Sequence, residues 1–328
     1  MATQPMAERA DSFNDLYQSL AATIGQVIQG KPESIELVLL ALIAEGHLLV
    51  EDVPGVGKTT LAKALARSID GDYGRIQFTP DLLPSDVVGV NVWNRASGEF
   101  DFRPGPVFAN IVLADEINRA SPKTQSALLE AMAERQVTID GTTRHLPPPF
   151  LVIATQNPIE NEGTYPLPES QLDRFLLKVS MGYPDREAEL EILASHGDRD
   201  LLEDIQPVIT VAQVNGLAAA ARTVHIAGSL QGYLVDLAHA TRHHPHVSVG
   251  MSPRATLALQ RVARARAATR GRTYVTPDDI KALAGPVLAH RLLLSPAARS
   301  GRATAESVIA DVLSQVPQPE ARPVQSAG

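Results

Sequence analysis

The most informative feature of this sequence is a glycine-bearing loop between two apolar segments. Residues 51–60 read EDVPGVGKTT and separate the apolar run 47–50 from the apolar-periodic stretch 61–69. A strand, a loop with Gly55 and Gly57, and then a helix are typical of a phosphate cradle. The reason is that free backbone N–H groups and the helix dipole favour an anion. An ordinary glycine-containing loop is the alternative interpretation.

The residue types in this loop predict separate contacts with a nucleotide. Lys58 is expected to reach the β and γ phosphates, and the hydroxyl of Thr59 is expected to contact Mg²⁺. The strict pattern has a glycine where this chain has Asp52. Aspartate tolerates a left-handed turn better than most residues, so we expect the turn to survive. The loop residues expected to contact nucleotide are Val53, Pro54, Gly55, Val56, Gly57, Lys58, Thr59 and Thr60.

Composition limits the class of protein. The 328 residues, 44% of them hydrophobic, are enough for a sizeable core and favour two domains. Zero cysteines exclude disulfides and thiolate zinc sites. No apolar run reaches the roughly 18 to 20 residues of a membrane helix, and the N-terminus lacks an apolar signal core, so we expect a cytoplasmic protein. The formal charge of −8 argues against a chain that mainly coats nucleic acid.

Short apolar runs alternate with helical patterns in the first half of the chain. Five nearly continuous runs predict strands covered on both faces, at 47–50, 75–78, 110–114, 150–154 and 175–179. Amphipathic stretches between them predict helices at 35–44, at 61–69 and from Ser121 and Pro122 onward. We therefore expect an α/β nucleotide-binding domain with a parallel sheet over residues 1–183.

Strand signals nearly vanish after residue 184. Helical patterns follow at 186–194, 211–221, 230–241, 253–269 and 277–292. Several of them open with Ser-Pro or Thr-Pro, a common helix start. We expect a smaller all-helical domain over residues 184–315 and a disordered Pro-rich tail over residues 316–328.

Two acidic residues follow the third apolar run. A strand that ends in Asp115 and Glu116 can place one carboxylate toward Mg²⁺ and the next toward an attacking water. Asp115 is the candidate metal residue, and Glu116 is the candidate base. A solvated acidic pair is the alternative, but the phosphate loop upstream favours the catalytic interpretation.

Longer segments resemble one family. LADEINRA at 113–120, QSALLEAMAERQV at 125–137, ATQNPIENEGTYPLPESQLDRF at 154–175 and SPRATLAL at 252–259 resemble the MoxR family of AAA+ ATPases. The resemblance covers roughly residues 20–315. It implies a P-loop AAA+ core that binds ATP with Mg²⁺, followed by a helical lid, and it places the adenine side of the pocket near Val27 to Gly30.

The same resemblance implies three further site residues. Asn157 resembles the sensor I residue that positions the lytic water, although a turn-forming Asn before a proline is the alternative. Arg174 resembles an arginine finger that acts on the nucleotide of a neighbouring subunit, and its alternative is an ion pair with Asp173 or Glu169.

Arg254 also carries a physical signal. Ser252 and Pro253 predict a helix start, so Arg254 lies in the first turn, where a cation opposes the helix dipole and an anionic partner is expected. The resemblance makes Arg254 the sensor II residue, which reaches from the lid to the phosphates. A local bridge to a carboxylate is the alternative.

Two insertions predict β-hairpins. Residues 86–108 alternate apolar and polar positions around a Ser-Gly turn, and residues 137–146 contain an Asp-Gly turn. They resemble the helix-2 and pre-sensor insertions of the MoxR group. Trp93, the single tryptophan, is expected to pack in its hairpin, with a partner or pore contact as the alternative.

Two further patterns are weaker. His243, His244 and His246 flank a proline and should point in different directions, which argues against a metal site. Six arginines crowd one predicted lid helix and its end, and we expect a solvated face or an acidic neighbouring subunit rather than nucleic acid. They are Arg254, Arg261, Arg264, Arg266, Arg270 and Arg272.

These features predict a Mg²⁺-dependent ATPase whose sites form between subunits of a homo-oligomeric ring, for which the family expectation is a hexamer. MoxR proteins are typically chaperone-like and often work with von Willebrand A domain proteins. This sequence contains no such domain, so such a partner would act in trans. Two alternatives stay open, a nucleic-acid motor of the helicase clade and a scaffold that ATP switches with little turnover.

Overall fold

The computed structural model describes residues 6–53, 55–157, 163–195 and 201–319. The chain forms two compact units, Met1–Ala221 and Arg222–Gly328.

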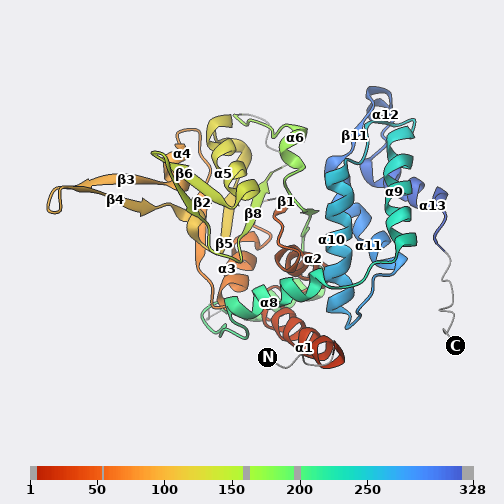
Figure 1. Ribbon diagram of the computed structural model, residues 1–328, viewed down its shortest axis with the longest axis horizontal. Helices are drawn as coiled ribbons and strands as arrows, with labels where there is room; N and C mark the ends of the chain where they lie inside the picture. The colour runs from red at the N-terminus through yellow and green to blue at the C-terminus, as the bar shows by residue number, and fades with distance from the viewer. Residues whose placement is uncertain (1–5, 54, 158–162, 196–200, 320–328) are drawn as a thin grey trace. The chain divides into compact units, whose positions relative to one another are not determined.

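A five-stranded sheet forms the centre of the first unit (Figure 1). Its order is β2 (Tyr73–Gln77), β5 (Ile111–Asp115), β8 (Leu151–Gln156), β1 (Leu48–Glu51) and β9 (Leu177–Val179). Every pairing in it is parallel, so the carboxyl ends of all five strands share one edge. The predicted α/β class and all five predicted strands are confirmed.

Burial along these strands shows where the sheet becomes accessible, at the carboxyl ends of the strands. In β5 and β8 every residue is buried except the last, which is partly exposed. Continuous burial is expected for parallel strands covered on both faces. The chain therefore becomes accessible where the strands end, and polar residues at those positions can reach a ligand.

The first unit also contains helices, and α2 (Pro32–Ile43) and α3 (Lys58–Ser68) contact strands of the sheet. Other longer helices are α5 (Pro122–Glu134), α7 (Arg186–Ser195) and α8 (Val211–Arg222), whose last residue begins the second unit. Shorter ones are α4 (Pro84–Val88), α6 (Glu169–Leu172) and the 3₁₀ turns η1 (Pro106–Phe108) and η2 (Ile117–Arg119). The Ser121 hydroxyl accepts from the Thr124 N–H and caps α5, as the Ser-Pro signal predicts.

The first helix, α1 (Met6–Gly25), was not among the predicted helices. It packs against α2 and α3, and the side chains of Phe13, Tyr17, Leu20 and Ile24 are buried. These four residues have helical spacing, so an apolar periodicity was present in the sequence.

Both predicted hairpins are confirmed. Strands β3 (Gly89–Asn94) and β4 (Glu99–Pro104) pair antiparallel, as do β6 (Gln136–Ile139) and β7 (Thr142–His145). Asp140 and Gly141, with φ of 48° and 78°, are both left-handed, as the tight Asp-Gly turn requires. Figure 1 shows the β3–β4 hairpin extending away from the sheet of its own unit.

The second unit is mainly helical, as predicted. It contains α9 (Gly228–His243), α10 (Pro253–Thr269), α11 (Pro277–Leu288), η3 (Ala289–Arg291), α12 (Pro296–Ser300) and α13 (Ala305–Gln315). One departure from an all-helical unit is the small antiparallel pair of β10 (Val247–Val249) and β11 (Leu293–Leu294). Helix α11 was predicted to reach residue 292 but ends at Leu288. The 3₁₀ turn η3 and strand β11 follow it.

The described residues between 201 and 221 pack with the rest of the first unit. The N–H groups of Val208 and Ile209 donate to the carbonyl of Ser68 at the end of α3. Leu202 and Ile205 join Val27 and Ala64 in an apolar cluster. The contacts thus divide the chain at 221–222, and the domain boundary at 183–184 stays a prediction from the loss of strand signals.

Most of the predicted disordered tail, residues 320–328, lies outside the described residues.

Among the helices that are described, none has both the length and the apolar composition needed to cross a membrane. The cytoplasmic location stays a prediction.

Candidate active site

The phosphate loop runs from the end of β1 to the start of α3. Gly55 and Gly57 have φ of 84° and 89°, which is the left-handed region that favours glycine. A Cβ at Gly55 would meet nothing within 4 Å, and one at Gly57 would meet only Ile28 Cδ1 at 3.9 Å. Conformation therefore requires glycine here, and the approach to the loop backbone is open, as a bound phosphate needs.

Helix α3 begins at Lys58, and Gly57 is the N-cap of this helix. The first N–H groups of a helix have no partner within it, so this end of α3 offers donors to an anion. The Lys58 ammonium donates to the carbonyl of Asp52 across 3.2 Å, which holds it over the loop. Thr59 and Thr60 follow in the first turn, Val53 and Val56 lie in the loop, and Pro54 lies outside the described residues.

The expected reason why Asp52 is tolerated is wrong. Asp52 is not among the residues with positive φ, so this position does not need a left-handed conformation. Its side chain is instead buried and accepts hydrogen bonds from backbone beyond β9. The departure from the strict loop pattern is therefore a structural contact rather than a compromise.

Asp115 ends β5, beside β8 in the sheet. Its Oδ1 accepts from the Thr155 hydroxyl at 2.7 Å, and its Oδ2 accepts from Arg75 Nη2 at 2.9 Å. The Thr155 hydroxyl also accepts from the N–H of Glu116 at 2.9 Å. Sequence reasoning missed Thr155 and Arg75, although a polar residue at the end of an apolar run was a usable signal for Thr155.

Glu116 has an unusual backbone for a non-glycine residue. Its φ and ψ of 57° and 50° are left-handed, a conformation that costs about 1–3 kcal/mol and is concentrated at functional sites. Its Oε2 accepts from Gln77 Nε2 at 3.0 Å and pairs with Arg119 Nε at 3.3 Å. Neighbours from β2 and η2 therefore hold this carboxylate at the edge of the sheet.

Asn157 directly follows β8, which lies between β5 and β1. The sheet order thus places its backbone between the Asp115 strand end and the phosphate loop. This position is compatible with the predicted contact to the γ-phosphate. The five residues after Asn157 lie outside the described residues.

Arg174 and Arg254 lie in different units of the chain. Arg174 Nη1 donates to the carbonyl of Leu129 in α5 at 2.9 Å, rather than forming the ion pair with Asp173 or Glu169 that was the alternative. Arg254 lies in the first turn of α10, after the Ser252 cap, as predicted. It belongs to the second unit, so its reach to the phosphates stays a prediction.

Gly30 lies at a tight contact. Its φ is 70°, and a Cβ there would lie 2.6 Å from the Cβ of Ala188 in α7. Both conformation and space therefore require glycine. The neighbouring Val27 and Ile28 are buried, which makes this turn an apolar wall of the first unit.

The candidate metal ligands, the Asp115 carboxylate and the Thr59 hydroxyl, are oxygen donors, which fit Mg²⁺ better than a softer metal. The described residues hold no group of three or more His, Cys, Asp or Glu side chains arranged for a metal ion. Mg²⁺ typically takes one or two protein oxygens and completes its shell with waters and substrate phosphates. The Asp115 carboxylate and the Thr59 hydroxyl provide this kind of donor set.

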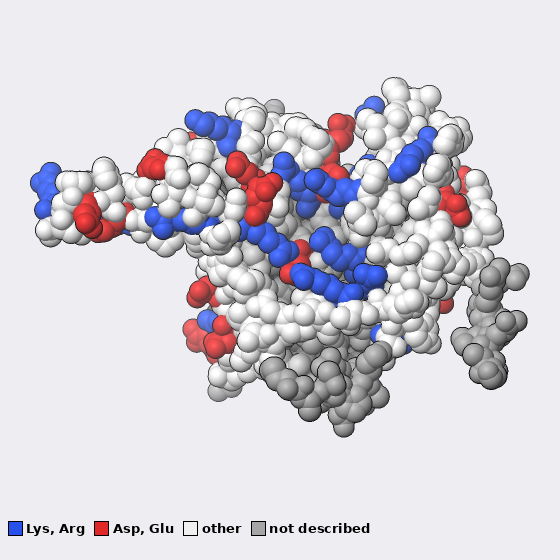
Figure 2. Space-filling model, in the orientation of Figure 1, with Lys and Arg blue, Asp and Glu red and all other residues white. Residues whose placement is uncertain are grey.

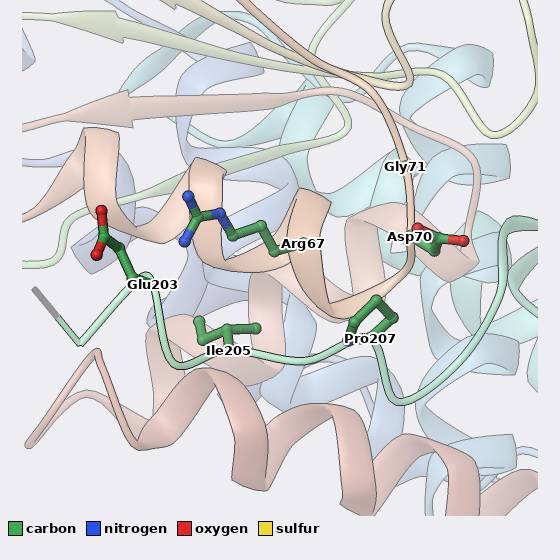
Figure 3. Close-up of a pocket in the computed structure, with 6 residues that line it drawn as sticks. All are labelled: Arg67, Asp70, Gly71, Glu203, Ile205 and Pro207. Atoms are coloured by element: carbon green, nitrogen blue, oxygen red, sulfur yellow. The ribbon is translucent and has the colours of Figure 1, made fainter.

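A separate pocket of about 440 Å³ lies at the other end of α3. Figure 3 shows Arg67 and Glu203 on its wall, with Ile205 and Pro207 below them. Because α3 begins at Lys58 and ends at Ser68, its length of roughly 16 Å separates this pocket from the phosphate loop. The pocket is therefore not part of the phosphate site.

Trp93 and the histidines make local contacts. Trp93 packs edge to face on Phe100 within the β3–β4 hairpin, with ring centroids 5.1 Å apart, and 52% of Trp93 stays exposed.

His244, the residue after α9, lies with its Nε2 3.0 Å from Asp311 Oδ2 on α13, and this contact joins the end of α9 to α13 within the second unit.

The expectation for the lid arginines is wrong for two of them. Arg266 and Arg272 bind the buried Asp279 rather than forming a solvated face or meeting a neighbouring subunit. These two arginines therefore stabilise the second unit itself.

A parallel sheet with a phosphate loop after β1, an acidic pair after β5 and a polar residue after the strand between them defines a P-loop ATPase of the AAA+ class. A family model described as "ATPase family associated with various cellular activities (AAA)" matches residues 47–177, and an "AAA lid domain" model matches residues 239–312.

Known proteins similar to this chain agree with that class. The chain is 42% identical to Chaperone MoxR1 of Mycobacterium tuberculosis over 93% of its length and 83% of that protein. It is 51% identical to the uncharacterized protein YeaC of Bacillus subtilis, over 91% and 93%. The crystal structure of a candidate ATPase from Cytophaga hutchinsonii superposes with a TM-score of 0.90 at 40% identity, over 95% and 98%. The chain belongs to the MoxR family of AAA+ ATPases and hydrolyses ATP.

Proposed function

We propose that this ATPase depends on Mg²⁺, completes its active site between two copies of the chain in a ring, and uses ATP hydrolysis to remodel a partner protein. The observation that carries the proposal is the convergence at one sheet edge. The ends of β1, β5 and β8 bring the phosphate loop, the Asp115–Glu116 pair and Asn157 to adjacent positions.

Each side chain of this edge has a separate role in hydrolysis. The Lys58 ammonium and the N-terminus of α3 bind phosphate oxygens. Mg²⁺, held through Thr59 and Asp115, neutralises charge on the β and γ phosphates when bound. Glu116 accepts a proton from the attacking water, and Asn157 orients that water against the γ-phosphate. The left-handed backbone of Glu116 supports this role, because such conformations are concentrated at functional sites.

Arg174 supports a site shared between copies. In its own chain its hydrogen bond goes to the backbone of α5. An arginine supplied by the next copy would stabilise the charge that develops on the phosphoryl group during transfer. Arg254 of the second unit would add a further cation to the phosphates.

A mixing experiment tests the shared site. Arg174→Ala and Glu116→Gln are each expected to be nearly inactive alone. In a random equal mixture, about a quarter of the interfaces combine an intact Glu116 with an intact Arg174 from the adjacent copy, so ATPase activity should return. The control mixes Lys58→Ala with Glu116→Gln. These residues serve the same side of one site, so no activity should return. If the first mixture stays inactive despite verified mixed assembly, the shared site is wrong.

The β3–β4 hairpin and a named relative support a protein client. Phe100 is 67% exposed, and Val90 and Trp93 are also exposed on the hairpin. Exposed aromatic residues are typical of surfaces that bind other proteins. The relative named Chaperone MoxR1 is 42% identical to this chain over 83% of its own length. A von Willebrand A domain protein in trans is the partner class we propose to look for first.

Capture with a trapped form tests this part of the proposal. Glu116→Gln held with ATP should retain a client that wild-type protein releases, and Lys58→Ala, which cannot hold ATP, should not retain it. A protein recovered equally with both variants would not be a client of the ATP cycle.

The hairpin surface does not favour the nucleic-acid alternative. On the face in Figure 2, basic and acidic side chains both lie along the β3–β4 hairpin. Arg95 and Arg103 are exposed there, and so are Glu99 and Asp101. A nucleic-acid groove would present mainly one sign of charge. Stimulation of the ATPase by DNA or RNA would reverse this preference.

A further inference from the structure

Asp52 occupies the position at which the phosphate-loop pattern has a glycine. Its residue is only 6% exposed, and a buried carboxylate is costly unless hydrogen bonds satisfy it. Because its backbone does not have positive φ, glycine would have no conformational advantage here. The carboxylate must therefore be explained by its contacts.

Those contacts join the phosphate loop to the chain after β9. Oδ2 of Asp52 accepts from the N–H of Met181 at 2.5 Å and from the N–H of Gly182 at 2.8 Å. The Ser180 hydroxyl lies 3.4 Å from the same oxygen. Oδ1 accepts from the N–H of Val53 at 3.1 Å. Successive N–H groups converging on one oxygen form a typical anion-binding concavity, and this one holds a carboxylate of the same chain.

The Asp52 backbone makes two further contacts. Its N–H donates to the carbonyl of Gln156 at 3.2 Å, directly before Asn157. Its carbonyl accepts from the Lys58 ammonium at 3.2 Å. Asp52 thus lies between the two groups that the proposed function assigns to the γ-phosphate, and its carboxylate anchors this point to the backbone after β9.

We propose that Asp52 is a positioning residue for ATP hydrolysis: by anchoring the start of the phosphate loop to residues 181 and 182, it fixes the spacing between Lys58 and Asn157. The proposal rests on the proposed roles of those two residues. A carboxylate beside a phosphate site repels phosphate oxygens, so Asp52 does not increase ATP affinity. Its contribution lies in geometry, and displacing catalytic groups by about 1 Å can cost on the order of 100-fold in rate.

Two substitutions of Asp52 give a graded test. Asp52→Gly restores the general loop pattern but removes both acceptor oxygens. Asp52→Asn keeps one oxygen for residues 181 and 182 but turns an NH₂ group toward the N–H of Val53. We expect Kd for a fluorescent ATP analogue to stay within about threefold of wild type in both. We expect kcat to fall about tenfold or more in Asp52→Gly, with Asp52→Asn between that variant and wild type.

Hydrogen exchange provides a readout that is independent of turnover. In Asp52→Gly, amide exchange of residues 181 and 182 should accelerate, while the amides of β5 keep their protection. Gly182 has a φ of 60° with open space at its Cβ, so Gly182→Ala strains the same anchor through conformation alone. Because both changes act on one contact, the double variant should lose less kcat than the two single losses combined.

The control is Asp185→Ala. It removes another carboxylate-to-backbone hydrogen bond just beyond this segment, from the N–H of Ala188, without touching the phosphate loop. It should lower the melting temperature slightly and keep wild-type kcat.

Three outcomes would separate the possibilities. Wild-type kcat in Asp52→Gly would overturn the proposal. A loss of ATP affinity as large as the loss of kcat would also overturn it, because it would indicate a general structural role. Glu116→Gln is measured alongside: if that variant keeps wild-type kcat, the proposed function has failed, whatever Asp52 does.

Discussion

The two acidic centres of this protein differ in how fully their oxygens are used. In the second unit, Asp279 is completely buried, and both of its oxygens accept from several donors, supplied by Arg266, Arg272 and Thr276. In the first unit, the side chains of Asp115 and Glu116 stay 15% and 30% exposed. Among the described residues, the Glu116 carboxylate accepts from Gln77 and pairs with Arg119 through Oε2.

This difference is what we expect between a structural carboxylate and the one that we propose as the base. Both oxygens of Asp279 are used in hydrogen bonds that hold α10 and the start of α11 together. For Glu116, the proposed role requires an oxygen that can accept a proton from water. A carboxylate that acts as a base must keep an oxygen accessible to water. The partial exposure at the sheet edge provides this access.

The largest expected effect is on turnover at Glu116. Glu116→Gln preserves shape but removes the base, so kcat should fall by about 10²–10⁴-fold while ATP still binds. Steady-state ATPase assays and a nucleotide-binding titration check this. Glu134→Gln, an exposed glutamate at the end of α5, is the matched control and should keep wild-type kcat. A loss below tenfold would remove the proposed difference between the two acidic centres.

The next effect is on stability at Asp279. Asp279→Ala leaves two arginines facing an empty buried position, and breaking a buried pair costs about 3–5 kcal/mol. Thermal unfolding of the full chain should detect this loss. Asp278→Ala, its exposed neighbour in the same helix turn, should cost no more than about 1 kcal/mol. Equal losses would mean that burial and pairing at Asp279 are not the cause.

Acid should weaken the Asp279 centre. Burial raises the pKa of this carboxyl, but hydrogen bonds from Arg272 and Thr276 outweigh burial and hold the pKa below its usual value of 3.8. A depressed pKa contributes stability above the unfolded value, and that contribution is lost as the pH falls below about 3.8. The stability difference between wild type and Asp279→Asn should therefore be constant near neutral pH and shrink in this acid range. A difference that grows in acid would contradict the assignment.

The smallest effect is expected at Arg75. Its side chain is 48% exposed, and it meets Asp115 through one nitrogen, so this pair contributes about 0–1 kcal/mol. Arg75→Ala should change the melting temperature very little. Arg272→Ala, which removes a two-nitrogen contact to a buried carboxylate, should change it clearly more. A larger loss at Arg75 would place the first acidic centre among the structural ones.

Much of the fold was readable from local patterns. Runs of buried apolar residues predicted all five strands of the sheet, because a strand covered on both faces has no polar alternation to hide it. Turn chemistry predicted the hairpin at Asp140 and Gly141. Helix α1 was missed although its buried residues have helical spacing. Helix α11 was drawn too long because the apolar pattern continues through the 3₁₀ turn after Leu288.

The site was predictable in its motif residues and not in their partners. Lys58 is recognisable from its position after the glycine-bearing loop at the start of a helix, and Asp115 and Glu116 from their position at the end of a strand. Thr155 and Arg75, which hold Asp115, come from two other strands, and no spacing in the sequence joins them. The same reason explains the error at the lid arginines, where Asp279 reaches Arg266 and Arg272 only after α10 and α11 pack.

Local sequence was enough to predict the parallel α/β class, the glycines of the phosphate loop and the acidic pair, because each depends on residues close together in the chain. The contacts of Asp52 could be found only in the folded chain. Its partners, residues 181 and 182, lie far along the sequence and meet it because β1 and β9 are neighbours in the sheet. Hydrogen bonds made across a sheet edge depend on strand order, and local sequence does not encode that order.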